Sequence, residues 1–125
     1  MTQKDKDLLL KDLCARLPYG LKCEINDNVE ILDSICDDDG YYFNFIGDDK
    51  EGYTLDEVKP YLFPMSSMTE KQCEELIKLI NTGQNDNNEF MRSLCRIEFY
   101  HVNHLDYRGL IPKGLAKDAT KIKIY

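Results

Sequence analysis

The spacing of hydrophobic residues changes twice along this sequence of 125 residues. Residues 5–17 place leucines and a cysteine on one side of a helix, and Pro18 ends that pattern. Residues 21–63 alternate hydrophobic and polar side chains in short runs, which is typical of strands with one buried face. Helical spacing returns at Met65 and continues to Leu105. The sequence therefore predicts a helix, a sheet and two further helices in that order, which is an α+β fold.

Short polar turns divide the alternating region into about four strands. The segments Asn26 to Asn28, Asp37 to Gly40 and Gly47 to Gly52 contain the residues that favour tight turns. Strands joined by such short turns pair antiparallel, because parallel neighbours need long crossovers. The fourth segment, Tyr53 to Phe63, contains Pro60, which requires a sheet edge or a bulge. We therefore expect a small antiparallel sheet of about four strands that is strongly bent or partly barrel-like.

The region after the sheet is expected to form two helices. Thr69 and Gln72 have the spacing of a capping box, which marks the start of the first helix, and Gly83 marks its end. The second runs to about Leu105, and the residues from Lys121 onward alternate like an exposed edge strand. The predicted organisation is a single domain over residues 1–125, with the N-terminal helix and sheet in 1–64, two helices in 65–105 and a basic, extended C-terminal tail in 106–125.

Helical projection also predicts which side chains of the helices are buried. In the first helix, Asp12 and Arg16 fall opposite the leucines, so we expect them in solvent. In the last helix, Glu98 falls within the apolar arc, where an ionised carboxylate is costly unless it is paired. The residues expected on apolar stripes are Leu9, Leu10, Leu13, Cys14 and Leu17 in the first helix, Cys73, Leu76, Ile77 and Ile80 in the second, and Phe90, Met91, Leu94, Cys95, Ile97, His101, Val102 and Leu105 in the third.

The cysteines and the apolar runs indicate a compartment. The five cysteines are an odd number, widely spaced and without a CxxC pair. Such spacing indicates neither a disulfide framework nor a structural zinc site, and we expect no cofactor. The longest apolar runs are far shorter than the ~20 residues that cross a bilayer, and the charged first residues differ from a secretory signal. These features predict a cytoplasmic protein that does not enter membranes.

The charge of the chain is uneven. The net charge of −7 opposes nonspecific binding to nucleic acid, because phosphates repel an acidic surface. Residues 106–125 carry five basic and two acidic side chains, a net charge of +3, which leaves −10 for residues 1–105. Contact of the basic tail with the acidic body accounts for this imbalance within the chain. The alternative is a tail that contacts nucleic acid.

Both histidines lie near carboxylates in the sequence. Glu98, His101 and His104 form E-x-x-H-x-x-H, whose first half is the spacing of carboxylate-bridged metal sites in helix bundles. Glu98 and His104 lie about 120° apart around a helix, so one ion would reach only two of the three, and we assign no metal ligand. His101 oriented by Glu98 or Asp106 is the candidate general base, although no cysteine or serine has the local sequence of a nucleophile.

The segment after the last helix carries residues that are typical of binding sites. Arg108 and Lys113 could recognise an anionic group or an acidic partner, unless Arg108 pairs with Asp106 or caps the helix. Tyrosine with arginine is typical of binding hot spots. The predicted binding residues are Tyr107, Arg108 and Lys113, with Tyr41, Tyr42 and Tyr53 as an added aromatic face.

Three stretches of the sequence resemble a known group of proteins. DLLLKDLCARLPYGLKC at 7–23, VKPYLFPMSSMTEKQ at 58–72 and HLDYRGLIPKGLA at 104–116 resemble small uncharacterised proteins encoded in phages, prophages and related elements of gut anaerobic bacteria. The likeness covers both ends and the centre of the chain. It implies a bacterial cytosolic setting and an accessory, nonenzymatic role for a mobile element, and it implies no activity for any residue.

These observations favour a noncatalytic protein-binding or accessory module of a bacterial mobile element, with a protein partner. One alternative is a small metal-dependent or acid/base enzyme centred on Glu98 and His101. A further alternative is a regulator that contacts nucleic acid through its basic tail. The oligomeric state does not follow from the sequence.

Overall fold

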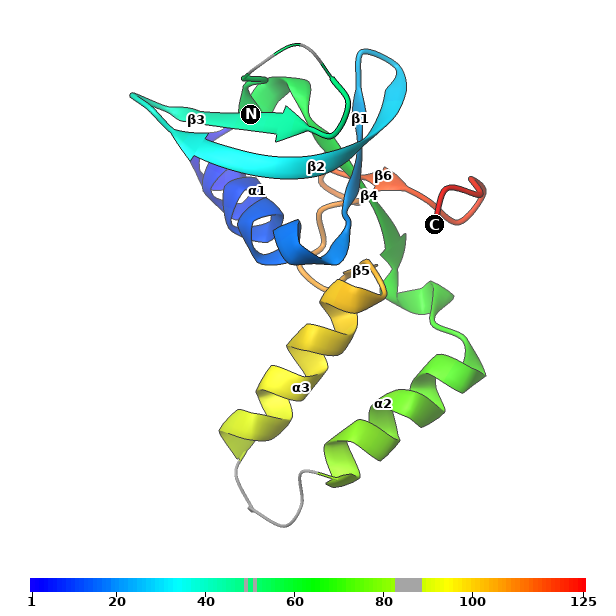
Figure 1. Ribbon diagram of the computed structural model, residues 1–125. Coiled ribbons are helices and arrows are strands. Elements are labelled where there is room, and N and C mark those ends of the chain that lie inside the picture. The colour runs from blue at the N-terminus through cyan, green and yellow to red at the C-terminus, as the bar shows by residue number, and fades with distance from the viewer. Residues whose placement is uncertain (49, 51, 83–88) are drawn as a thin grey trace.

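The computed structural model describes residues 1–48, 50, 52–82 and 89–125. Its fold is α+β, as the sequence predicts, with a helix, a sheet and two further helices (Figure 1). The helices are α1 (Gln3–Arg16), α2 (Glu70–Thr82) and α3 (Glu89–Val102), and the strands are β1 (Lys22–Ile25), β2 (Asn28–Asp37), β3 (Tyr41–Phe45), β4 (Lys59–Pro64), β5 (Leu105–Asp106) and β6 (Lys117–Asp118). Short 3₁₀ turns occupy Leu17–Tyr19, Leu55–Glu57 and Met65–Ser67.

The sheet is mixed and open. Its strand order is β3-β2-β1-β4-β5, and β6 also pairs with β4. The β1–β2, β2–β3 and β1–β4 pairs are antiparallel, whereas β5 and β6 run parallel to β4. The four predicted strands therefore pair antiparallel as expected, whereas the prediction missed β5 and β6, which run parallel to β4, and the sheet does not close into a barrel. The two parallel strands have two residues each, which is too short for an alternating pattern to reveal them.

The fourth predicted strand is shorter than its alternating sequence. Tyr53 forms an isolated bridge with Phe43, and the regular strand β4 begins only at Lys59. Pro60 is opposite Cys23 in the β1–β4 pair, and the parallel neighbours of β4 pair only with residues 61–64. At Pro60, β4 therefore has only β1 as a neighbour, because β5 and β6 join β4 after this residue. The missing amide hydrogen of Pro60 thus interrupts no hydrogen bond to either parallel strand.

The hydrophobic core lies between α1 and the sheet. Leu9 and Leu13 of α1 are buried, and α1 lies across one side of the β2–β3 hairpin (Figure 1). Leu110, Leu115 and Ala116, in the segment after β5, belong to the same core. The buried cluster consists of Leu9, Leu13, Leu21, Cys23, Ile25, Leu32, Phe43, Phe45, Tyr53, Val58, Leu62, Leu110, Leu115 and Ala116.

The predicted basic tail is packed against the sheet. Leu110, Leu115, Ala116 and Ala119 are buried, and β6 joins β4. The expected edge strand from Lys121 to Tyr125 was wrong, because these residues form a turn and irregular chain. Instead, the Tyr125 hydroxyl donates to the Tyr61 carbonyl at 2.9 Å and accepts from the Lys22 amide at 2.8 Å.

Helices α2 and α3 form a hairpin that projects away from the sheet (Figure 1). The Thr69–Gln72 capping box is confirmed: the Gln72 amide donates to Thr69 Oγ1 at 3.1 Å and the Thr69 amide donates to Gln72 Oε1 at 2.9 Å. Within residues 70–81, no side chain of α2 is buried, and only Phe99 and His101 of α3 are. The predicted burial of the apolar stripes was therefore wrong for α2 and for most of α3, whereas His101, also predicted on its stripe, is buried.

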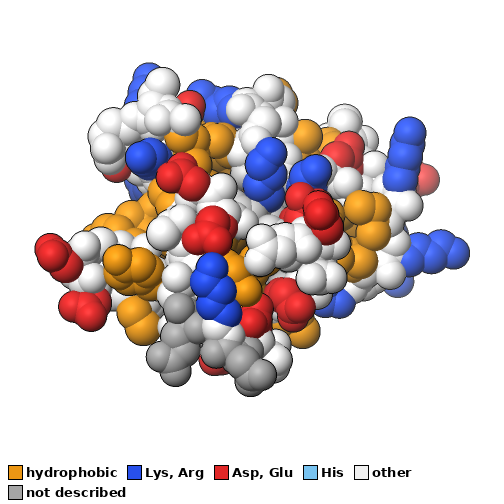
Figure 2. Space-filling model, turned by 90° about the horizontal axis from the view of Figure 1, so that it is seen from above, with side chains coloured by type: hydrophobic (Ala, Val, Ile, Leu, Met, Phe, Trp, Pro, Cys, Tyr) orange, Lys and Arg blue, Asp and Glu red, His pale blue; other side chains and the backbone are white. Residues whose placement is uncertain are grey.

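No helix among the described residues is long and apolar enough to cross a membrane. On the face seen in Figure 2, acidic and basic side chains are interspersed. The five cysteines are free thiols, and Cys14, Cys36 and Cys73 are exposed. The expectation that Cys14 and Cys73 lie on buried stripes was wrong.

Candidate functional site

A buried cluster of charged side chains joins α1 to the segment after α3. Arg16 Nε donates to Asp12 Oδ2 at 2.8 Å, and both side chains are 0% exposed. Arg16 Nη2 also donates to the carbonyl of Leu105 at 2.5 Å. The prediction that Asp12 and Arg16 face solvent was wrong, because they lie at i+3 and i+7 from Leu9, on the same buried face of α1 as Leu9 and Leu13. The chain around Leu105 and Arg108 supplies their further hydrogen bonds.

Arg108 and Tyr107 extend this cluster towards α3. Arg108 Nε donates to Asp12 Oδ1 at 3.1 Å, and Arg108 Nη2 donates to the Tyr107 hydroxyl at 2.8 Å. The Tyr107 hydroxyl lies 2.7 Å from His101 Nε2. The guanidinium carbons of Arg16 and Arg108 lie 5.4 and 4.9 Å from the centre of the Tyr107 ring, within the range of a cation–π contact.

The Asp12 carboxylate is held by two arginines in a site without solvent. Burial raises the pKa of Asp12 above its usual value, while Arg16 and Arg108 act in the opposite direction. Arg16 Nη1 is buried and has no hydrogen-bond partner among the described residues. The cluster is therefore a structural connection with incomplete hydrogen bonding, and such buried pairs are costly to break.

Asp106 organises the turn that follows β5. Its Oδ1 accepts from the Leu110 amide at 2.8 Å and its Oδ2 accepts from the Ile111 amide at 2.9 Å. Gly109, which lies between Asp106 and Leu110 in this turn, has φ +74°, a backbone conformation that residues with a side chain disfavour. Both carboxylate oxygens thus bind backbone amides, and His101 is paired with Tyr107 in place of the expected Asp106.

The two histidines lie in separate environments. His101 contacts Tyr19 and Tyr107, whereas His104 stacks on Tyr125 with ring centres 3.8 Å apart. Burial, with Arg16 and Arg108 nearby, lowers the pKa of His101 to about 4. Burial, with Arg16 and Lys22 nearby, lowers the pKa of His104 to about 4. Both rings are therefore neutral at pH 7.

Glu98 is exposed, although helical projection places it within the apolar arc of the third helix. It lines a groove of about 400 Å³ between α2 and α3, together with Glu75, Leu79, Cys95, Phe99, Val102 and Asn103. Glu98 and the buried His101 thus face different surroundings. Among the described residues, no group of three or more His, Cys, Asp or Glu side chains could hold a metal ion.

The tyrosines of the sheet do not form a common exposed face. Tyr41 is exposed, Tyr42 is half-buried against Gly52, and Tyr53 is buried with its hydroxyl 2.6 Å from Asp48. That hydrogen bond raises the pKa of Tyr53 to about 12. The other predicted binding residues also differ in exposure, because Tyr107 and Arg108 are half-buried in the charged cluster while Lys113 is exposed.

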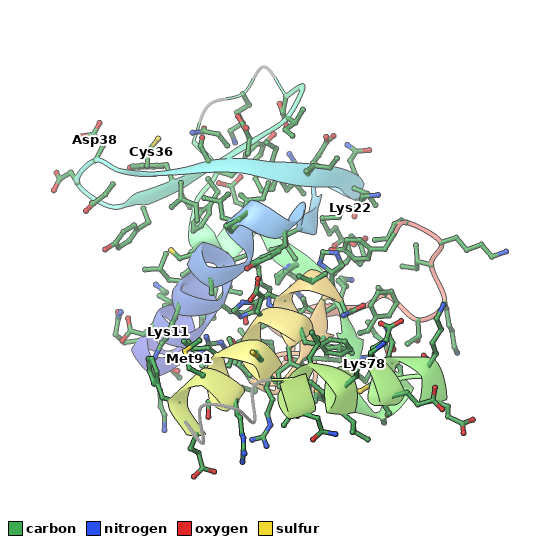
Figure 3. All side chains as sticks on the ribbon, turned by 60° about the horizontal axis from the view of Figure 1, so that its bottom comes forward. Lys11, Lys22, Cys36, Asp38, Lys78 and Met91 are labelled. Atoms are coloured by element: carbon green, nitrogen blue, oxygen red, sulfur yellow. The ribbon has the colours of Figure 1, made fainter. Side chains whose placement is uncertain are left out.

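The largest group of exposed hydrophobic side chains lies on α2 and α3. Seven residues there are 38–67% exposed, and we call them the hairpin surface: Ile77, Leu79, Phe90, Met91, Leu94, Ile97 and Val102. Figure 3 views the hairpin from its projecting end, with Lys78 on α2 and Met91 on α3, and with Cys36 and Asp38 at the far tip of the β2–β3 hairpin.

One face of α3 changes from exposed to covered along its length. Phe90, Leu94, Ile97 and His101 follow one another on this face at helical spacing. His101 is covered by Tyr19 and Tyr107, whereas the three hydrophobic residues before it are exposed. The hydrophobic spacing of this face was visible in the sequence, and its exposure was not.

Comparison with protein-family models, with curated proteins and with solved structures finds no match for this chain.

Proposed function

We propose that this protein is a noncatalytic protein-binding module and that the hairpin surface is its binding site. The observation that carries the proposal is the exposure of seven large hydrophobic side chains on two adjacent helices. Fourteen large hydrophobic side chains are exposed among the described residues, and half of them lie on this hairpin. Three of the seven, Phe90, Leu94 and Ile97, follow one another on one face of α3, and a continuous exposed apolar face is typical of an interaction site, whereas scattered surface hydrophobics need no explanation.

The energetics of the hairpin support the same proposal. Isolated helices of the length of α2 and α3, 13 and 14 residues, are marginally stable in water, and most helices gain stability by burying an apolar face. In this hairpin the burial is confined to Phe99 and His101 near the sheet. A partner that covers the hairpin surface supplies the missing burial, and it stabilises the helices as it binds.

The groove between α2 and α3, which includes Leu79 and Val102 of the hairpin surface, favours a helical partner. The groove between α2 and α3 has Leu79, Cys95, Phe99 and Val102 along its walls, with the carboxylates of Glu75 and Glu98 among them. An amphipathic helix that inserts its apolar side chains into such a groove is a common mode of recognition. The resemblance to phage and prophage proteins supports an accessory role of this module for a bacterial mobile element, in the cytoplasm.

A photo-crosslinking amino acid tests the proposal directly. Benzoylphenylalanine is placed at Ile97, on the hairpin surface, and separately at Ile46, which is 55% exposed and lies just after β3. The proposal expects a covalent adduct with protein from position 97, in bacteria that encode the chain, and none of the same mass from position 46. Absence of an adduct at 97, or the same adducts at both positions, would contradict it.

A further inference from the structure

We infer that the groove between α2 and α3 binds a cationic amphipathic helix of another protein. Apolar side chains of that helix contact Leu79, Phe99 and Val102, and its lysine or arginine side chains pair with Glu75 and Glu98. This inference rests on the proposed function and names the chemistry of the partner.

The walls of the groove run along the two helices. On α3, Cys95, Glu98 and Val102 follow one another at i, i+3 and i+7, so they form one stripe that spans two turns, about 10 Å. On α2, Glu75 and Leu79 lie one turn apart and form the opposite wall. The length of the groove therefore matches the spacing of the anchor side chains of a docked helix, at i, i+3 or i+4, and i+7.

The backbone of α2 and α3 favours a helix over an extended strand as the occupant. A strand gains much of its affinity from main-chain hydrogen bonds to a sheet edge. The amides and carbonyls inside a helix are already bonded to one another, so the groove offers the occupant side-chain contacts alone. A helix with one apolar face supplies such contacts without leaving its own backbone groups unpaired.

The charged residues that line the groove are both acidic. The described residues of α2 and α3 carry five acidic and four basic side chains, and of these nine only Glu75 and Glu98 line the groove. Neither carboxylate forms an ion pair within the part of the chain that the structure describes. An apolar or acidic helix would cover both carboxylates without a counter-ion, which is costly, whereas a cationic helix supplies one.

Lysine and arginine also suit the apolar walls of the groove. Their long aliphatic stems can lie along hydrophobic side chains while the charged ends reach the carboxylates. Arginine can in addition bind a carboxylate through two parallel hydrogen bonds. The net charge of the whole chain, −7, attracts a cationic partner from a distance and speeds its association.

Two synthetic peptides test the inference by fluorescence anisotropy. Both are amphipathic helices of about 15 residues with the same leucine face, and they differ only in carrying lysine or glutamine beside that face. The full-length wild-type chain is expected to bind the lysine peptide at least about fivefold more tightly than the glutamine peptide. The double variant Glu75→Gln/Glu98→Gln is expected to lose this preference while its affinity for the glutamine peptide does not fall.

The control variant makes the same change of charge on the same helices. Glu74→Gln/Glu89→Gln alters exposed residues that do not line the groove, and it is expected to keep the preference for lysine. All four substitutions are at exposed positions, so the far-UV circular dichroism of both variants is expected to match the wild type. An equal loss of preference in both variants overturns the inference, because net charge alone would then explain binding. Equal binding of the two peptides by the wild type, or no binding of the lysine peptide, also overturns it.

The crosslinking and peptide results separate this inference from the proposed function. An adduct at Ile97, from a chain without preference for the lysine peptide, supports the binding module and overturns the cationic helix as its partner. A preference that depends on Glu75 and Glu98, without an adduct at Ile97, supports the groove and contradicts binding through the Phe90, Leu94 and Ile97 face. An adduct of twice the chain mass identifies a second copy and overturns another protein as the partner.

Discussion

Asp12 and Arg16 are the two charged side chains of α1 that have no contact with solvent. Charged groups in such sites are stable only while they remain paired and hydrogen-bonded, because an isolated buried charge is costly. The pair is local, one helical turn apart, but its other partners are Leu105 and Arg108. These few side chains therefore fix how the N-terminal helix lies against the C-terminal segment.

Removing the charge of Asp12 tests this role. Asp12→Asn keeps the side-chain volume but leaves Arg16 buried without its counter-ion, and we expect a loss of about 3–5 kcal/mol in the free energy of unfolding. Urea denaturation monitored by circular dichroism measures the change. Asp7→Asn on the same helix is the control, because Asp7 is exposed and its loss should cost about 0.5 kcal/mol or less. A loss of similar size in both variants would contradict the role of the buried cluster.

The histidines make stability depend on pH. The folded pKa values of His101 and His104, about 4, lie below the value of 6.5 in an unfolded chain. Between these values the unfolded chain binds more protons, so stability is complete above pH 6.5 and falls as the pH drops towards 4. We expect a loss on the order of 1 kcal/mol per histidine between about pH 7.5 and 5.5.

Urea denaturation at the two pH values measures this loss. The double variant His101→Gln/His104→Asn is expected to show a smaller loss on acidification. Glutamine can still bond to the Tyr107 hydroxyl, and asparagine tolerates the positive φ of 56° at residue 104. An equal pH dependence in the wild type and the variant would show that other groups cause it.

The Asp12–Arg16 pair also shows which features of a residue can be predicted from the sequence and which cannot. The spacing of Asp12 and Arg16 at i and i+4 is the signature of a helical ion pair, and it could have been recognised. Whether that pair faces solvent depends on Arg108, which is 96 residues away. Helical projection alone places Arg16 only about 20° from Leu9, so the wrong assignment came from the assumption that charged side chains face solvent.

At the scale of elements, the start of α2 is the feature that the sequence predicted best. A capping box is local, since Thr69 and Gln72 need only each other and the backbone between them. The strands β1, β2 and β3 were predictable for the same reason, because alternation and turn residues are local signals. Strands β5 and β6 exist only through pairing with β4, and nothing in their own two residues indicates it.

The cap gives a measurable contribution to α2. Thr69→Ala removes the hydroxyl that accepts from the Gln72 amide, and we expect a loss of about 1 kcal/mol in the local stability of the helix. Amide hydrogen exchange of α2 measures this loss, with Lys71→Ala at an exposed position of the same helix as the control. Faster exchange throughout α2 in the Thr69 variant alone is expected. Unchanged exchange would mean that contacts with α3 or a partner hold the helix instead.

Helix α3 shows how a correct periodicity leads to a wrong burial assignment. The arc containing Phe90, Leu94 and Ile97 is apolar, as the spacing indicates, but these residues are exposed. A sequence pattern reports that a helix has an apolar face and not which molecule covers it. The same pattern that predicted a core helix is thus the basis for the proposed binding site.

At the scale of the whole molecule, the α+β order of elements was predictable and the arrangement of the C-terminal segment was not. The lysines of residues 106–125 suggested an extended basic tail, yet Leu110, Leu115 and Ala119 of the same segment are buried. Lys117 lies 3.6 Å from Glu24, so part of the basic charge is used within the chain. Small residues such as Ala119 carry little signal in a hydrophobic pattern, although they pack closely.

The bonds between α1 and the chain around Leu105 also affect the order in which the protein is made. Asp12 and Arg16 are translated early, and the groups that satisfy them follow 89 and 96 residues later. Before then, Leu9 and Leu13 can already pack against the sheet, but the two buried charges have only each other as partners. We therefore expect the final docking of α1 to wait until the segment from Leu105 to Arg108 has been synthesised.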